Sequence, residues 1–152
     1  MADDRIQLIT HQGKQILTVD LSHCSAVRVE KILREVPEVV STYPLGSVLV
    51  FCDLTGASFN REAVLAMKEA AVFDKPYVKR SAWVGAESFP PEYSKSLSSF
   101  SGREFPAFKR REEALAWLVK LRGASFLRTR FFYLYGLLGK CTMRRAVVQH
   151  SS

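Results

Sequence analysis

Four polar or flexible residues, Asp53, Thr55, Gly56 and Ser58, follow an apolar run and are the residues of this sequence best placed to do chemistry. The run, SVLVFCDL, is typical of a buried strand, and NREAVLAMKEAAVF after it predicts a helix with Asn60 as N-cap. Open α/β sheets receive ligands at the carboxyl ends of their strands, and a helix N-terminus can accept an anion. We therefore predict a partner or ligand surface at Asp53, Thr55, Gly56, Ser58 and Asn60. The alternative is a capped turn, with Gly56 supplying backbone freedom and the hydroxyls satisfying local amides.

A second group of candidate binding residues lies in the polar segment KPYVKR, which we expect to be a connecting loop. Lys75, Tyr77, Lys79 and Arg80 combine positive charge with an aromatic ring there. Lysine and arginine bind phosphates and carboxylates, so such a loop can hold a phosphate or an acidic partner. The alternative is a solvated connector without a binding role.

Other chemistry finds little support in the residue pattern. His11, His23 and His150 are far apart and lack the spacing of metal ligands, while Cys24 and Cys52 lie among apolar residues. The sequence contains no G-x-S-x-G elbow, Walker loop or G-x-G-x-x-G motif, and no Ser, His and acid set stands out as a triad. We therefore predict no metal, no cofactor and no enzymatic activity, with an enzyme of unrecognised type as the weakest alternative.

The periodicity of the first half of the chain predicts the elements that must position the candidate site. RIQLITH and QILTVDL alternate apolar and polar residues, so they predict an antiparallel hairpin with Gly13 in its turn. From Ser25, a predicted N-cap, apolar residues recur at helical spacing up to Val36. Pro37 is expected to end or kink that helix, leaving PEVVSTYP as a turn or loop.

The second half of the chain alternates strands and helices. SAWVGA predicts a buried strand, Pro90 and Pro91 suit the start of a helix that stops at Gly102, and FPAF predicts a short edge strand. We expect the two last helices to turn inward the apolar residues Tyr93, Leu97 and Phe100, and then Ala114, Trp117, Leu118 and Leu121. The order β-β-α-β-α-β-α-β-α predicts an α/β fold with a mainly parallel mixed sheet and helices packed against it.

The charge is unevenly distributed and divides the chain. The 22 Lys and Arg exceed the 15 Asp and Glu by 7, yet no acidic residue occurs from Ala114 onward. We therefore predict a folded domain over residues 1–122 and a basic, aromatic extension over residues 123–152. Its longest apolar stretch, Phe131 to Gly139, is far shorter than the ~20 residues that span a bilayer. The extension is expected to lie on an anionic membrane surface, to contact nucleic acid or to be a variable appendage. Residues 1–119 hold 15 basic and 15 acidic residues, so the folded body is not expected to bind nucleic acid.

The element order, with CDLTGASF joining a buried strand to a helix, resembles the STAS domains of bacterial anti-sigma-factor antagonists and sulphate-transporter regulators. The segments FDKPYVKRSAWVG and FPAFKRREEALAWL make it similar to the small stand-alone SpoIIAA-like branch, which is also grouped with CRAL-TRIO-like lipid-binding folds. The resemblance covers residues 5–120. It implies a cytoplasmic regulatory or ligand-sensing module without enzymatic activity, in which the strand-to-helix loop meets a partner.

The chain departs from that family at the expected phosphorylation site. Phosphorylated members have an Asp-Ser-Ser/Thr-Gly helix start, whereas this chain has NREA. Placing Asp53, Leu54, Gly56 and Phe59 on their counterparts puts Glu62 where the phosphoacceptor serine falls, so we add Glu62 to the candidate site. A carboxylate there either mimics a permanently charged state or is an ordinary acidic residue of a first helical turn.

These observations leave two main functional hypotheses. The first is a non-catalytic regulator that binds a protein partner near residues 53–58 and the adjacent helix. The second is a carrier of a lipid or small apolar ligand, which requires an apolar cavity of roughly 300 Å³ or more. An odd number of cysteines, 3, and no apolar leader favour a reduced cytoplasmic protein.

Overall fold

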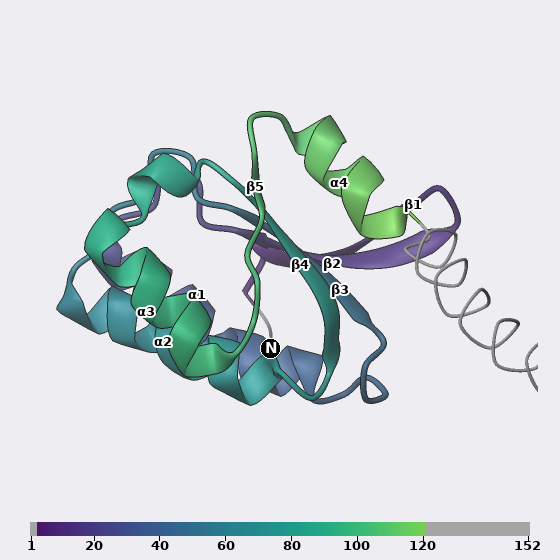
Figure 1. Cartoon of the computed structure of the whole chain (residues 1–152), viewed down its shortest axis with the longest axis horizontal. Helices are drawn as coiled ribbons and strands as arrows, with labels where there is room; N and C mark the ends of the chain where they lie inside the picture. Colours follow the sequence, from purple (N-terminus) through teal and green to yellow (C-terminus); the bar gives the residue numbers. More distant parts are fainter. Residues whose placement is uncertain (1–2, 121–152) are drawn as a thin grey trace, which may run out of the picture. The chain divides into compact units, whose positions relative to one another are not determined.

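The structure is a computed structural model that describes residues 3–120. These residues follow the predicted order of strands and helices, with one 3-10 turn added, and form an α/β fold (Figure 1). The predicted basic extension lies outside the described residues. The elements are β1 (Ile6–His11), β2 (Lys14–Asp20), α1 (Ala26–Val40), β3 (Val48–Asp53), α2 (Arg61–Asp74), β4 (Val78–Val84), the 3-10 turn η1 (Ala86–Ser88), α3 (Pro91–Ser101), β5 (Ala107–Phe108) and α4 (Arg111–Val119).

The five strands form one mixed sheet in the order β1-β2-β3-β4-β5. The β1–β2 hairpin is antiparallel, and every other neighbouring pair is parallel. The predicted interior strand β3 is therefore central and has parallel neighbours on both sides. Residues Val48 to Cys52 are all buried, as expected of a strand covered on both faces.

Helices cover both faces of this sheet. Side chains alternate between the faces along each strand, so neighbouring residues of one strand pack against different helices. Cys52 of β3 packs in the larger core, which α1, α2 and Leu97 of α3 close. Its neighbour Phe51 packs on the opposite face in a smaller core with Leu118 of α4. Figure 1 shows α1, α2 and α3 on one side of the strands and α4 on the other. Because the helices lie on the faces of the sheet, the loops that follow β2, β3 and β4 form the edge at the carboxyl ends of these strands.

The prediction that the first helix can end at Val36, with PEVVSTYP as a turn or loop, is wrong, since α1 continues through Pro37 to Val40. Proline removes one amide donor from the helix interior, which disfavours continuation. Val40, one turn after the buried Val36, is itself fully buried in the larger core. Tertiary packing of this last turn therefore outweighs the local preference of proline. The N-cap prediction is confirmed, because the Ser25 hydroxyl accepts a hydrogen bond from the Arg28 amide at 3.3 Å.

Two further sequence-based expectations need correction. Of the apolar residues expected to face inward on α3, only Leu97 is buried, whereas Phe100 is 67% exposed. The helix packs against α2 along a narrow strip, so apolar spacing overstates its buried face. On α4, Ala114 and Leu118 are buried as expected, Leu115 and Val119 are buried as well, and Trp117 is only partly buried, while Leu121 lies outside the described residues.

Candidate functional site

The predicted site lies at a corner where the loops after β2, β3 and β4 meet. The Leu21 amide donates to the Asp53 carbonyl at 2.8 Å, and the Leu54 amide donates to the Val84 carbonyl at 2.8 Å. The His23 amide donates to the Thr55 carbonyl, also at 2.8 Å. These main-chain bonds fix three loops from distant parts of the sequence in one place. We call residues 53–60, with the contacts they make, the corner.

Hydrogen bonds from side chains also hold the corner in place. The Asp53 carboxylate accepts a hydrogen bond from the Thr55 amide at 2.9 Å, and the Ser88 hydroxyl accepts one from the Gly56 amide at 3.1 Å. Gly56 has φ +65°, and a Cβ there would lie 2.5 Å from His23 Nδ1. Gly56 thus supplies the backbone freedom that the sequence predicts. The outcome is a turn whose main-chain groups are largely satisfied internally.

The start of α2 forms the remaining part of the corner. Asn60 is the N-cap, and its side-chain oxygen accepts a hydrogen bond from the Ala63 amide at 2.8 Å. The Ser58 amide donates to the Cys24 carbonyl at 3.0 Å, while the Ser58 and Glu62 residues are exposed. Glu62 lies in the first turn of α2, where a negative charge is favourable near the positive end of the helix dipole. The structure therefore brings Asp53, Thr55, Gly56, Ser58, Asn60 and Glu62 into one neighbourhood.

An apolar strip on the outer side of α2 continues from this corner, and the sequence reasoning missed it. Leu65, Val72 and Phe73 are 44%, 42% and 52% exposed. Leu65 and Val72, seven residues apart, lie on the side of α2 away from its buried face, and Phe73 lies at the border of that side, near the C-terminal end of the helix. We call these three residues the α2 strip. The signal was present in the sequence, because helical spacing places Val64, Met67 and Ala71 on one inward face and leaves these three apolar residues outside it.

Charged contacts border the α2 strip on both sides. The Arg34 guanidinium of α1 pairs with Glu69 at 3.2 Å on one side, and Lys68 Nζ lies 5.2 Å from the centre of the Tyr93 ring on the other. An apolar centre with a charged rim is the usual composition of a protein-binding surface. An exposed ion pair such as Arg34–Glu69 contributes little to stability, so these side chains can form new contacts with a partner at little cost to folding.

The second group of candidate residues lies elsewhere. Because β3 and β4 are parallel, Val78 pairs with Val48 at the start of β3, whereas Val84 pairs with Asp53 at its end. Lys75, Tyr77 and Lys79 surround the first of these positions, so the structure does not bring them together with the corner. KPYVKR is also not simply a loop, since β4 begins at Val78 and includes Lys79.

Packing accounts for much of this second group. The Tyr77 ring is partly buried and stacks on Phe73, with ring centres 6.4 Å apart. Arg80 is buried on the α4 face of the sheet, where it donates to the Trp117 carbonyl at 2.9 Å and lies over the Trp117 ring. Lys75 and Lys79 are exposed. Arg80 is therefore a packing residue, and the two lysines stay candidates without a neighbouring site.

The larger core contains a small cavity of about 40 Å³ between α1, α2 and the central strands. Asp74 and Arg103 line it, and the Asp74 Oδ1 atom has no hydrogen-bond partner among the described residues. Burial raises the pKa of Asp74 to about 7, although the nearby Arg103 charge lowers it. Arg103 donates to the Ala71 carbonyl at 3.0 Å and to the Ser81 hydroxyl. A carrier of an apolar ligand needs roughly 300 Å³, so this cavity does not support that hypothesis.

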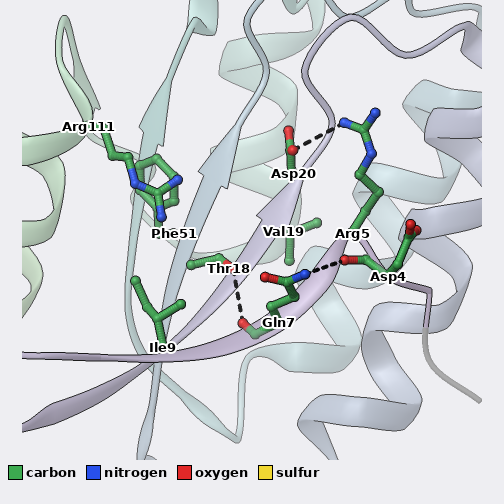
Figure 2. A pocket seen from close by; sticks show the side chains of 9 residues that line it. All are labelled: Asp4, Arg5, Gln7, Ile9, Thr18, Val19, Asp20, Phe51 and Arg111. Atoms are coloured by element: carbon green, nitrogen blue, oxygen red, sulfur yellow. Dashed lines mark hydrogen bonds and ion pairs between the residues drawn. The ribbon is translucent and has the colours of Figure 1, made fainter.

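A shallow hollow of about 110 Å³ lies on the other face, over β1 and β2 (Figure 2). Its polar groups are paired with one another: Arg5 bonds Asp20 at 3.1 Å, and the Thr18 hydroxyl donates to the Gln7 carbonyl at 3.0 Å. Although burial opposes it, bonds from Ser22 and the charge of Arg5 lower the pKa of Asp20. The guanidinium of Arg111 lies 5.0 Å from the centre of the Phe51 ring. The groups neutralise each other, so the hollow offers no activated acid, base or nucleophile.

Residues 3–120 give no support for a metal site, a membrane-spanning helix or a reactive thiol. No group of three His, Cys, Asp or Glu side chains there is arranged to hold a metal ion. None of the described helices has the length and apolar content to cross a bilayer. Cys24 and Cys52 are buried free thiols, and burial raises the pKa of both. A raised thiol pKa makes a cysteine a poor nucleophile.

Comparison with known proteins places the fold. No family model matches the sequence, and no curated protein matches it. Among solved structures, an uncharacterised DUF3478-family protein from Shewanella loihica, described as having a SpoIIAA-like fold, superimposes with a TM-score of 0.54. The match has 17% sequence identity and covers 74% of this chain and 91% of that protein. Together with the topology above, it confirms the resemblance drawn from the sequence as one of fold: the chain has a SpoIIAA-like α/β fold.

Proposed function

We propose that this protein is a non-catalytic interaction module of STAS type, whose protein partner docks on the corner and the neighbouring α2 strip. The observation that carries the proposal is their continuity: a main-chain-fixed loop leads into a helix with three exposed apolar side chains. Fixed loops lose little conformational entropy on binding, and exposed apolar area contributes favourable burial. The fold similarity supports this reading, since protein interaction is what the STAS resemblance implies.

The same site gives no support for catalysis. The Asp53 carboxylate is engaged by the Thr55 amide, and the Asn60 side chain by the Ala63 amide. Side chains held in this way define loop shape and do not form a nucleophile and base pair. We therefore propose that the chain acts by binding alone. Because its two described cysteines are free thiols, we keep the cytoplasm as its proposed location.

Control of the partner by phosphorylation at the STAS position is not part of this proposal. Glu62 stands where the family's phosphoacceptor serine falls, in an exposed first helical turn. We propose instead that Glu62 gives the corner a permanent negative charge. Replacing Glu62 with Gln, which removes the charge and keeps the size, or with Lys, which reverses the charge, is then expected to weaken the partner interaction, whereas Asp keeps the charge and should have a smaller effect.

The proposal is tested by quantitative affinity capture with paired variants. Leu65→Arg places a charge in the α2 strip, and Ala116→Arg places the same charge on an exposed position of α4, on the opposite face of the sheet. Proteins enriched with the wild-type chain should be lost with Leu65→Arg and retained with Ala116→Arg. Equal enrichment with both variants, while both remain folded by circular dichroism, contradicts the proposed surface.

A further inference from the structure

The two outer edges of the sheet differ in length and protection. β1 contributes a six-residue edge, IQLITH, without charge or proline. β5 contributes only two residues and follows Pro106, which has no amide hydrogen. Natural proteins block exposed edges with charges, proline, bulges or very short strands. The β5 edge uses two of these devices and the β1 edge uses none, so β1 is the edge suited to accept another strand.

The hydrogen-bond phase of β1 identifies the groups that face outward. The Asp20 amide donates to the Arg5 carbonyl at 2.9 Å, so Arg5 and Asp20 form a hydrogen-bonded pair at the start of the hairpin. Such pairs alternate along an antiparallel ladder, so the main-chain groups of Ile6, Leu8 and Thr10 point away from β2. The Ile6 amide already donates to the Asp3 carbonyl at 2.9 Å. Leu8 and Thr10 thus keep both groups available for a partner strand.

A second copy of this chain fits this edge. If two β1 strands run antiparallel with Ile9 on a twofold axis, Leu8 of each faces Thr10 of the other and exchanges both hydrogen bonds. The exposed side chain of Leu8, 43% accessible, then packs at the joint. The same arrangement brings the start of one hairpin, where the Asp4 side chain is 84% exposed and lies 3.3 Å from Arg28, towards the turn at Lys14 of the other.

We propose that two copies of this protein pair through β1 and form one continuous ten-stranded sheet. The blocked β5 edge stops the sheet at both ends, so association closes at the dimer and does not continue into a fibre. The dimer uses neither the corner nor the α2 strip. Its test is therefore independent of the proposed partner interaction, and either idea can fail alone.

Sedimentation of the full chain across the micromolar range tests this pairing. We expect a concentration-dependent species of twice the 17.2 kDa mass of the single chain. Thr10→Pro removes one outward amide and should shift the population to monomer, whereas Thr10→Val keeps that amide and the dimer. Leu8→Lys should also give monomer, while Leu45→Lys, at a 72% exposed position in the loop between α1 and β3, should not. A monomeric wild-type chain at every concentration, or a dimer unaffected by Leu8→Lys and Thr10→Pro, overturns the proposal.

Disulfide trapping tests the register itself. In a Cys141→Ser background, Ile9→Cys places two thiols across the twofold axis, and mild oxidation with diamide should convert most of the chain to a covalent dimer. Gln15→Cys, on the neighbouring strand β2 opposite Thr10, is the matched control and should stay monomeric. Trapping at Gln15→Cys and not at Ile9→Cys contradicts pairing through β1.

Discussion

Individual glycines determine how closely the loops of the corner approach each other. Gly85 has φ +71°, and a Cβ at this position would overlap the main chain of Thr55. At Gly56 the obstacle is the His23 side chain, which can move. The Gly85 contact is therefore the stricter requirement, because backbone held by hydrogen bonds on both sides cannot yield without opening the corner.

Gly85→Ala is predicted to be much more destabilising than a glycine substitution that meets open space. Gly46 is the matched control, since it has φ +65° and no atom within 4 Å of a built Cβ. We expect about 1 kcal/mol for Gly46→Ala from the left-handed backbone alone, and roughly 1–3 kcal/mol more for Gly85→Ala from the overlap. Urea unfolding of both variants measures the difference. Equal losses would mean that the loops after β3 and β4 are not in contact.

Asp74 is predicted to lower the free energy of unfolding as pH rises, which is the opposite of the usual effect of an acidic residue. Burial raises its pKa from 3.8 to about 7, so the folded protein holds this proton more tightly than the unfolded chain does. Its contribution to the free energy of unfolding should therefore decrease as pH rises from about 4 to 7 and stay constant above that. Asp74→Asn should remove this decrease and stabilise the protein at pH 8 by roughly 1–3 kcal/mol.

Urea unfolding at a series of pH values measures the Asp74 effect. Glu38→Gln, at an exposed position of α1, controls for the loss of one acidic group. Parallel pH curves for the wild type and Asp74→Asn would show that the Asp74 carboxyl is not held in a low-polarity site beside Arg103.

Among the elements, α1 carries a local conflict that its packing overrides. Pro37 lies inside the helix and gives up the amide that would bond the Leu33 carbonyl, while Val40 beyond it is fully buried. Pro37→Ala restores that amide, so we expect stabilisation of about 1–2 kcal/mol after allowing for the greater freedom of the unfolded chain. Glu38→Ala is the neighbouring control and should be nearly neutral. Destabilisation by Pro37→Ala in urea unfolding would contradict this account of α1.

The sequence predicts elements well where one signal dominates. The unbroken apolar run of β3 and the caps Ser25 and Asn60 are local features, and the structure confirms them. The inward face of α3 was mispredicted because Phe100 follows helical spacing yet meets no neighbouring layer. Which side of a helix is covered depends on the elements around it, and spacing within the helix carries no information about them.

The candidate site shows the same division between local and long-range information. Residues 53–60 form one loop, so their proximity follows from the sequence alone. Their contacts with His23 and Ser88 depend on strand order and could not be predicted from spacing. The sequence predicts Lys75 and Lys79 as a separate basic group, and parallel pairing of β3 and β4 places them at the other end of these strands from the corner.

The whole molecule offers separate surfaces for two proposed interactions. The corner and α2 strip are proposed for a protein partner, and the β1 edge for a second copy of the chain. The two cores packed on the faces of the sheet around β3 hold both surfaces in place. A dimer through β1 would thus present two partner surfaces on one assembly, which increases the effective concentration of the second binding event.

Site-specific photocrosslinking in cells tests whether a protein partner binds the corner and the α2 strip. A benzophenone amino acid at Ser58 or Leu65 should give a covalent adduct with the same partner protein upon irradiation. The same probe at Glu112 or Ala116 of α4, on the opposite face, should not. Adducts confined to the α4 positions, or their absence at both Ser58 and Leu65 in a folded and expressed chain, would contradict the proposed function.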